Sequence, residues 1–247
     1  MGETIQSVER AAGILRLLAS GPRQLGVAEL ARAMGLPKGT LHGILRTLVH
    51  VGFVEQDPAT GKYRLGGTLL HLGSSYLDVN ELRTRSLNWA DALAGRSRES
   101  VYIGTSHEGQ VLVVHHVFRP DDSMQVLQVG ALLPLHASAL GKVLLAFDPY
   151  GEPGDLAPFT PRTLVTPDDL TKDLELVRSR GWGADVEEWV EGEVSLAAPI
   201  RDARGLVVGA IGIRGAVERL TEDGDPRKDM ISYVRDAARA ITRDLTR

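Results

Sequence analysis

Hydrophobic residues in the first fifty positions recur at helical spacing in three separate runs. The runs cover residues 5–19, 27–34 and 37–50, and the third carries the apolar stripe Leu41, Ile44, Leu45 and Leu48. Apolar residues three and four positions apart form one face of a helix. Gly35 supplies a tight turn before the third run. Helix, short helix, glycine turn and helix together predict a helix-turn-helix.

Two short strand-like runs follow, at residues 53–56 and 62–65, with the turn-forming residues 57–61 between them. Three helices and a hairpin predict a winged helix-turn-helix over residues 1–66. In this arrangement the third helix enters the major groove, and the hairpin reaches the DNA backbone or the minor groove. The candidate DNA-contacting side chains are Lys38, Thr40, His42 and Arg46 on the helix, and Lys62 and Arg64 on the hairpin.

A fourth helical stripe predicts a linker helix at residues 67–79, and helical spacing continues over residues 80–96. After residue 96 the period of the hydrophobic pattern shortens from that of a helix to that of a strand. Strand-like runs at 101–103, 111–114, 125–135, 195–200 and 206–213 alternate with helical runs at 138–147, 168–180 and 226–243. Strands joined by hairpins and interleaved with helices predict an α+β domain with an antiparallel sheet over residues 80–247. The stretch rich in Pro, Gly and Asp at 148–161 is expected to be a mobile loop.

The composition narrows the class of protein. The chain has 247 residues, of which 43% are hydrophobic and 24% charged, as in an ordinary globular protein. It has no cysteine, which excludes disulfides, thiolate nucleophiles, cysteine-ligated metals and redox sensing. No apolar run approaches the roughly 20 residues of a membrane span, and the N-terminus does not have the pattern of a signal peptide. We therefore expect a cytoplasmic protein without a membrane partner.

The net charge of −4 hides an asymmetry. Residues 1–76 carry eight basic and five acidic side chains, a net charge of +3, whereas the remainder carries 20 basic and 27 acidic side chains, a net charge of −7. A basic N-terminal part and an acidic C-terminal part suggest two modules with different partners.

Several groups of residues could suggest an enzyme or a metal site. His136, Ser138 and Asp185 could form a hydrolase triad, but the chain has no G-x-S-x-G elbow. His115-His116 and Glu187-Glu188 are adjacent pairs, and adjacent strand residues point to opposite faces. The chain also lacks a Walker A loop and a GxGxxG motif. We predict no catalytic residues, metal or cofactor. The alternatives left open are a metabolite-binding enzyme with an appended helical domain and an architectural DNA binder without an effector.

The chain resembles the IclR family of bacterial transcriptional regulators over residues 5–245. At the N-terminus the likeness lies in residues 7–11 (SVERA), 27–31 (VAELA), 36–40 (LPKGT) and 41–63, and at the C-terminus in residues 133–142 (LPLHASALGK), 181–188 (GWGADVEE) and 195–200 (SLAAPI). The resemblance implies a GAF-like domain that binds a small-molecule effector, and a homodimer or dimer of dimers on a near-palindromic operator in double-stranded DNA. Three further runs, at residues 43–48, 115–122 and 215–220, resemble members that regulate glycerol utilisation.

The family's effector site, carried over position by position, falls on six residues. Ala139 and Leu140 would present backbone N–H groups at a helix start, which favours an anion. Asp185 and Ser195 would supply side-chain contacts. Gly212 and Arg214 share one strand face, where family members often have small polar residues.

Glycine and arginine at these two positions depart from the family pattern, and with it from the small-acid ligand that is usual in the family. One hypothesis is that Arg214 binds a charged ligand group, because guanidinium forks bind carboxylate or phosphate. The ligand would then be an anion such as glycerol 3-phosphate. The alternative is that Arg214 pairs structurally with Asp185 or Glu187. The function predicted from the resemblance is repression of a catabolic operon, controlled by this small anionic metabolite.

Overall fold

The computed structural model describes residues 5–20, 22, 24–79, 81–121, 123–148 and 150–247, and for Ser20 and residues 74–79 only the backbone. The chain divides into two compact units, Met1–Val79 and Asn80–Arg247, which are described separately. Among the described residues, no helix is long and apolar enough to cross a membrane.

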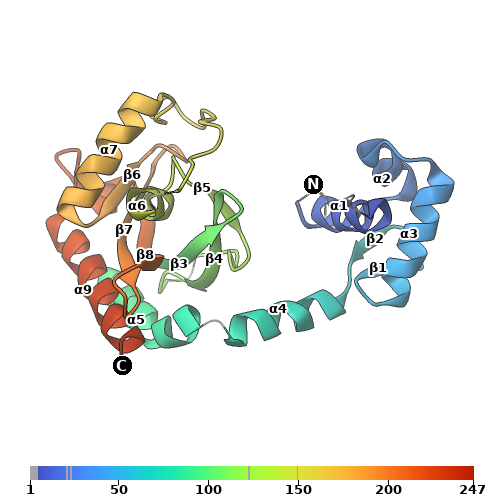
Figure 1. Ribbon diagram of the computed structural model, residues 1–247, viewed down its shortest axis with the longest axis horizontal. Helices are drawn as coiled ribbons and strands as arrows, with labels where there is room; N and C mark the ends of the chain where they lie inside the picture. Colours follow the sequence, from blue (N-terminus) through green and yellow to red (C-terminus); the bar gives the residue numbers. More distant parts are fainter. Residues whose placement is uncertain (1–4, 21, 23, 80, 122, 149) are drawn as a thin grey trace. The chain divides into compact units, whose positions relative to one another are not determined.

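The first unit is a bundle of three helices with a hairpin, followed by a fourth helix (Figure 1). Its elements are α1 (Gln6–Ser20), α2 (Val27–Met34), α3 (Lys38–His50), β1 (Val54–Gln56), β2 (Tyr63–Leu65) and α4 (Gly67–Val79). Gly35 caps α2 in the left-handed conformation with φ 62°, which glycine adopts without steric cost. The predicted helix-turn-helix and wing are confirmed, with helix ends within one residue of those expected.

One apolar cluster holds the first unit together. It joins the inner stripes of the three helices to the hairpin through residues that include Ile14, Leu30, Leu41, Leu45 and Val54, each fully buried. The hairpin strands are antiparallel, and Tyr63 of β2 also exchanges backbone hydrogen bonds with Leu25. These contacts fix the wing against the helices. The opposite side of α3 is left facing solvent.

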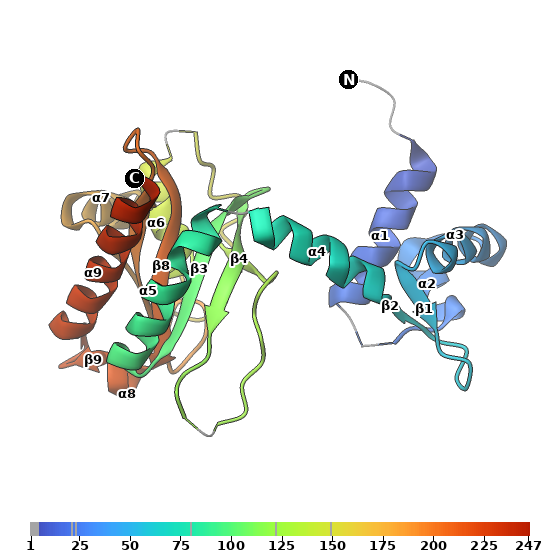
Figure 2. The ribbon, with the colours of Figure 1, turned by 90° about the horizontal axis from the view of Figure 1, so that it is seen from below.

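The second unit is a six-stranded antiparallel sheet with helices on both faces (Figure 2). The strand order is β5-β4-β3-β8-β7-β6, with β3 (Ser100–His107), β4 (Gln110–Val117), β5 (Leu132–Pro134), β6 (Gly183–Val186), β7 (Glu193–Arg201) and β8 (Val207–Ala216). The helices α5 (Glu81–Ser97) and α9 (Lys228–Leu245) lie side by side on one face. The helix α6 (Ala139–Phe147) covers the other face and carries α7 (Pro167–Arg180). The predicted α+β class is confirmed.

Strand alternation separates the two faces of this sheet. Tyr102, Ala197 and Ala210 face the cluster built on α6, whereas the intervening residues Ile103 and Ile211 point the other way. The short helix α8 (Val217–Leu220) and the strand pair β9 (Thr221–Glu222) and β10 (Asp225–Pro226) lead into α9.

Two local expectations differ from the structure. Of the strand predicted over residues 125–135, only Leu132–Pro134 forms β5. Before it, the Gln125 side-chain amide accepts from the Arg119 N–H and donates to the Arg119 carbonyl, both at 2.8 Å, and thereby replaces ladder bonds. The strand β6 was not predicted, because four residues beginning with Gly183 are too few to show a period. The described residues of 148–161 form no helix or strand.

Candidate functional site

The outer side of α3 carries the polar residues expected to meet DNA. Lys38, Thr40, His42 and Arg46 are all exposed, while the inner stripe of the helix is buried. His42 and Arg46 lie one turn apart and line a groove of about 440 Å³ that runs to Gln56 and Tyr63 of the hairpin. The groove brings the helix and the wing together on one surface. Gln56 was missed by the sequence analysis, because a three-residue strand shows too little alternation to assign its faces.

The two basic residues predicted on the wing differ in their surroundings. Lys62 is exposed. Arg64 donates to the Glu55 carboxylate, with Nε–Oε2 at 3.0 Å and Nη2–Oε2 at 2.9 Å. The Gly67 N–H reaches the same carboxylate at 3.2 Å. The Arg64 hydrogen bond, followed by that of Gly67, lowers the pKa of Glu55. A phosphate can bind the remaining N–H groups of Arg64 or replace Glu55 as its partner.

A small pocket in the second unit brings together five of the six residues expected at the effector site. Its volume is about 20 Å³, room for about one water molecule. It lies between the start of α6 and the sheet face that α6 covers. Its lining includes Tyr102 and Trp189 with the expected residues Ala139, Leu140, Ser195, Gly212 and Arg214.

The start of α6 is positioned by its cap. The Ser138 hydroxyl accepts from the Gly141 N–H at 3.1 Å and donates to the Pro134 carbonyl at 2.6 Å. Gly141 is required here, since a Cβ on it would lie 2.3 Å from the Leu135 carbonyl oxygen. The Ala139 N–H points at the Ser195 hydroxyl, 3.4 Å away. The helix start thus faces the pocket, where the Ala139 N–H has the Ser195 hydroxyl as its partner. An anion bound at this helix end would compete with that hydroxyl.

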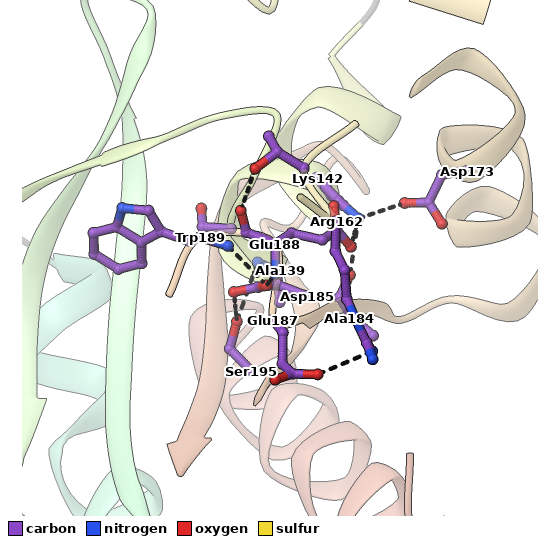
Figure 3. Close-up of polar contacts among 12 residues, drawn as sticks. Ala139, Lys142, Arg162, Asp173, Ala184, Asp185, Glu187, Glu188, Trp189 and Ser195 are labelled. Carbon is purple, nitrogen blue, oxygen red and sulfur yellow. Dashed lines mark hydrogen bonds and ion pairs between the residues drawn. The ribbon is translucent and has the colours of Figure 1, made fainter. Parts of the chain in front are cut away.

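Asp185 does not line the pocket and lies behind Ser195 (Figure 3). It is 4% exposed. One carboxylate oxygen accepts from the Ser195 hydroxyl at 3.0 Å, and the other accepts from the N–H groups of Glu188 at 2.7 Å and Trp189 at 3.3 Å. Burial raises the pKa of Asp185, although the Glu188 N–H and the Ser195 hydroxyl oppose the rise. Asp185 was expected to contact the ligand. In the structure its carboxylate instead holds Ser195 and the Trp189 backbone in position.

Arg214 is half-buried and lines the pocket. Its guanidinium forms an ion pair with Glu193 and lies 4.3 Å from the centroid of the Trp189 ring. The alternative hypothesis, that Arg214 pairs with Asp185 or Glu187, is wrong for both residues. Glu187 instead binds Arg162 at 3.0 Å. Arg214 and Gly212 share a strand face, as predicted, since both stand opposite residues of one face of β3.

A buried lysine network supports the wall that carries Trp189 (Figure 3). Lys142 of α6 is 1% exposed, and its ammonium contacts Glu188 Oε1 at 2.5 Å, Asp173 Oδ2 at 3.0 Å and the Ala184 carbonyl at 3.1 Å. Burial raises the pKa of Glu188 to about 7, while the Lys142 charge opposes that rise. The network ties α6 and α7 to the segment between β6 and Trp189. No pattern in the sequence indicated this network.

The residues that could have suggested catalysis or metal binding do not assemble. His136 Nε2 lies 3.0 Å from the Ala157 carbonyl, and the Ser138 hydroxyl serves the helix cap. His116 stacks on Tyr102 at 4.5 Å, and burial, followed by the neighbouring His115, lowers its pKa to about 4. Within the described part of the chain, no group of three potential ligands could hold a metal ion.

Comparison with known proteins covers both units. Residues 7–58 match the model of the IclR helix-turn-helix domain, and residues 74–243 match that of the bacterial transcriptional regulator IclR C-terminal domain. The chain is 56% identical to the glycerol operon regulatory protein of Streptomyces coelicolor and 55% identical to that of Streptomyces griseus. Each alignment covers 99% of this chain and 98% of the relative.

A solved structure shows the same fold around a ligand. It is an IclR homologue from Microbacterium hydrocarbonoxydans complexed with 4-hydroxybenzoate, with a TM-score of 0.82 and 25% identity over 97% of this chain and 99% of the other. These matches confirm the family resemblance predicted from the motifs, as well as the closer likeness to regulators of glycerol use. The matched families and relatives are transcriptional regulators, not enzymes.

Proposed function

Because the chain belongs to the IclR family of bacterial transcriptional regulators, we propose that it represses an operon for glycerol use and that a small anionic metabolite releases it from DNA. The observation that carries the target is the 56% identity over nearly the whole length of a glycerol operon regulatory protein. High identity through both units supports a common operator and a common effector. The effector favoured by the site is glycerol 3-phosphate.

On DNA, we propose that His42 and Arg46 read base edges from the groove between α3 and the wing, with Thr40 at the helix start. Lys38, Lys62 and Arg64 would contact phosphates, Arg64 after leaving Glu55. The exposure of these six side chains supports this division. Two winged-helix units in a homodimer, or four in a dimer of dimers, would match the half-sites of a near-palindromic operator.

At the effector site, we propose that a phosphate group binds the N–H groups at the start of α6 and the guanidinium of Arg214. The anion would replace the Glu193 carboxylate as the partner of Arg214. Since the pocket holds about one water molecule, the metabolite can enter only if side chains of the lining, such as Arg214 and Trp189, move. That movement would couple the effector to the DNA-binding equilibrium.

Isothermal titration of the full chain with glycerol 3-phosphate tests the effector site. We expect Arg214→Gln to weaken binding by roughly 10–100-fold, the equivalent of a charge-assisted hydrogen bond. The matched variant Glu193→Gln frees Arg214 and should strengthen binding a few-fold. Equal affinity of wild type and Arg214→Gln would remove Arg214 from the site, and no binding to any of the three proteins would rule out this ligand.

Operator binding is tested separately by fluorescence anisotropy with the DNA upstream of the glycerol operon and with a scrambled duplex. The Kd for the operator should be roughly 1,000-fold or more below that for the scrambled duplex. A ratio near one would contradict sequence-specific regulation and favour an architectural DNA binder.

A further inference from the structure

A second concave site lies in the second unit, between α9 and the C-terminal end of β7. The groove has a volume of about 500 Å³, within the range of small-molecule sites. It shares no lining residue with the effector pocket. Four arginines line it: Arg201 from β7, and Arg235, Arg239 and Arg243 from α9.

These arginines lack the close carboxylate partners that several other arginines of the same unit have. Among the residues that the structure describes, no carboxylate oxygen lies within 4.0 Å of the guanidinium nitrogens of Arg201, Arg235 or Arg243. Arg239 reaches Asp236 only at 3.8 Å. Other arginines of the unit pair closely, as in Arg219–Glu99, Arg119–Asp121 and Arg227–Asp229.

The spacing of the arginines concentrates positive charge on one face of α9. Arg235, Arg239 and Arg243 follow each other at intervals of four residues, and like charges at this spacing destabilise a helix. The charge is gathered in the second unit, where acidic residues outnumber basic ones. Since carboxylates are available in that unit and only Asp236 approaches a groove arginine, at 3.8 Å from Arg239, the arrangement favours an anion from outside.

The floor of the groove is small and apolar, which leaves room for the body of a ligand. Ala198 and Ala238 are 1% and 2% exposed, and Gly181 and Pro199 complete the floor. Thr242 adds a hydroxyl group on the wall. The Thr242 hydroxyl oxygen already accepts from the backbone N–H of Arg201 at 3.1 Å. The hydroxyl proton can therefore be donated to a ligand oxygen.

We propose that this groove binds a small organic phosphate, with the guanidinium groups of Arg235, Arg239 and Arg243 on the phosphate oxygens and the organic part on the apolar floor. The Arg201 guanidinium donates to the Gly205 carbonyl at 2.9 Å and lies 4.6 Å from the centroid of the Phe147 ring, so it contributes positive charge at the edge of the groove. Guanidinium forks match phosphate geometry, and several arginines together favour an anion of more than one charge. The groove has the volume of a small molecule, not of a DNA duplex. The site goes beyond the proposed function, because none of its residues takes part in operator or effector binding there.

Isothermal titration of the full chain with inorganic pyrophosphate, and in parallel with adenosine diphosphate, tests the proposal. We expect both to bind the wild type, and Arg235→Gln/Arg239→Gln to weaken each by at least 10-fold. The control Arg204→Gln/Arg247→Gln removes two arginine side chains that are 78% and 79% exposed and lie outside the groove lining; it should bind as the wild type does. Arg214→Gln should also retain binding, which separates the groove from the effector pocket.

Absence of binding to the wild type, or equal binding by the groove variant, would overturn the proposal. Binding of pyrophosphate that is lost in Arg214→Gln would likewise overturn it, since the phosphate would then lie in the effector pocket. If an oligo-glutamate peptide or a random DNA duplex needs the groove arginines while pyrophosphate does not bind, the partner is a macromolecule and the proposal is wrong. Arg243→Gln, in the last turn of α9, repeats the test if the double variant does not fold.

Discussion

Replacing the buried Lys142 by methionine tests whether the network behind the candidate effector pocket holds the second unit together. The substitution removes the ammonium that lies between Glu188 and Asp173. Two carboxylates then remain without their cation, and Glu188 is buried. Breaking a buried ion pair by removing one partner costs about 3–5 kcal/mol. For a unit of this size, that corresponds to a drop in Tm of roughly 6–20 °C.

Urea unfolding followed by tryptophan fluorescence measures this loss in the second unit alone, because all three tryptophans lie there, at positions 89, 182 and 189. The matched control is Lys172→Met on α7, where the lysine side chain is 73% exposed and 3.5 Å from Asp169. An exposed ion pair of this kind contributes about 0–1 kcal/mol. If the two variants differ by less than about 1 kcal/mol, the assigned role of Lys142 is wrong.

The pH dependence gives a second check on the same network. The pKa of Glu188 is raised from 4.5 to about 7, so the folded protein binds this proton more tightly than the unfolded chain. The free energy of unfolding contributed by Glu188 is therefore present below pH 4.5 and is lost as the pH rises through about 7. We expect Lys142→Met to lose more stability at pH 8 than at pH 6, and Lys142→Met/Glu188→Gln to recover part of the loss. A loss that is independent of pH would contradict this explanation.

Three further outcomes are expected. Arg46→Ala, on the outer side of α3, should weaken operator binding by roughly 5–150-fold without changing the Tm, as measured by anisotropy and circular dichroism; unchanged affinity would remove Arg46 from the interface. Leu45→Ala, fully buried in the first unit, should cost about 2–5 kcal/mol by circular dichroism and leave the tryptophan transition in place. Gly141→Ala should destabilise the second unit by about 1–3 kcal/mol, because its Cβ would meet the Leu135 backbone; a stabilised variant would show that helix propensity dominates there.

Local patterns were sufficient to predict most helices and strands of this chain. Helical spacing and the turn at Gly35 placed α2 at its observed bounds, and the polar outer side of α3 followed from its buried stripe. Where a side chain replaced backbone pairing, as Gln125 does before β5, no period in the sequence could show it.

The candidate effector site was less accessible to sequence reasoning, because its contacts join distant segments. The partner of Arg214 depends on the register of β7 and β8, in which Ser195 stands opposite Arg214. The role of Asp185 depends on the short strand β6, which was not predicted. Lys142 lies in an apolar helix whose own sequence gives no sign of the carboxylates on α7 and beyond β6.

The most direct test of effector-controlled repression is an anisotropy titration of the wild-type protein on labelled operator DNA, with and without glycerol 3-phosphate at constant ionic strength. The proposed function predicts specific binding that weakens by roughly 5–150-fold in the presence of glycerol 3-phosphate, the usual range of allosteric coupling. An equal concentration of inorganic sulfate should leave the operator affinity unchanged. Operator binding that is the same with and without glycerol 3-phosphate would contradict the account.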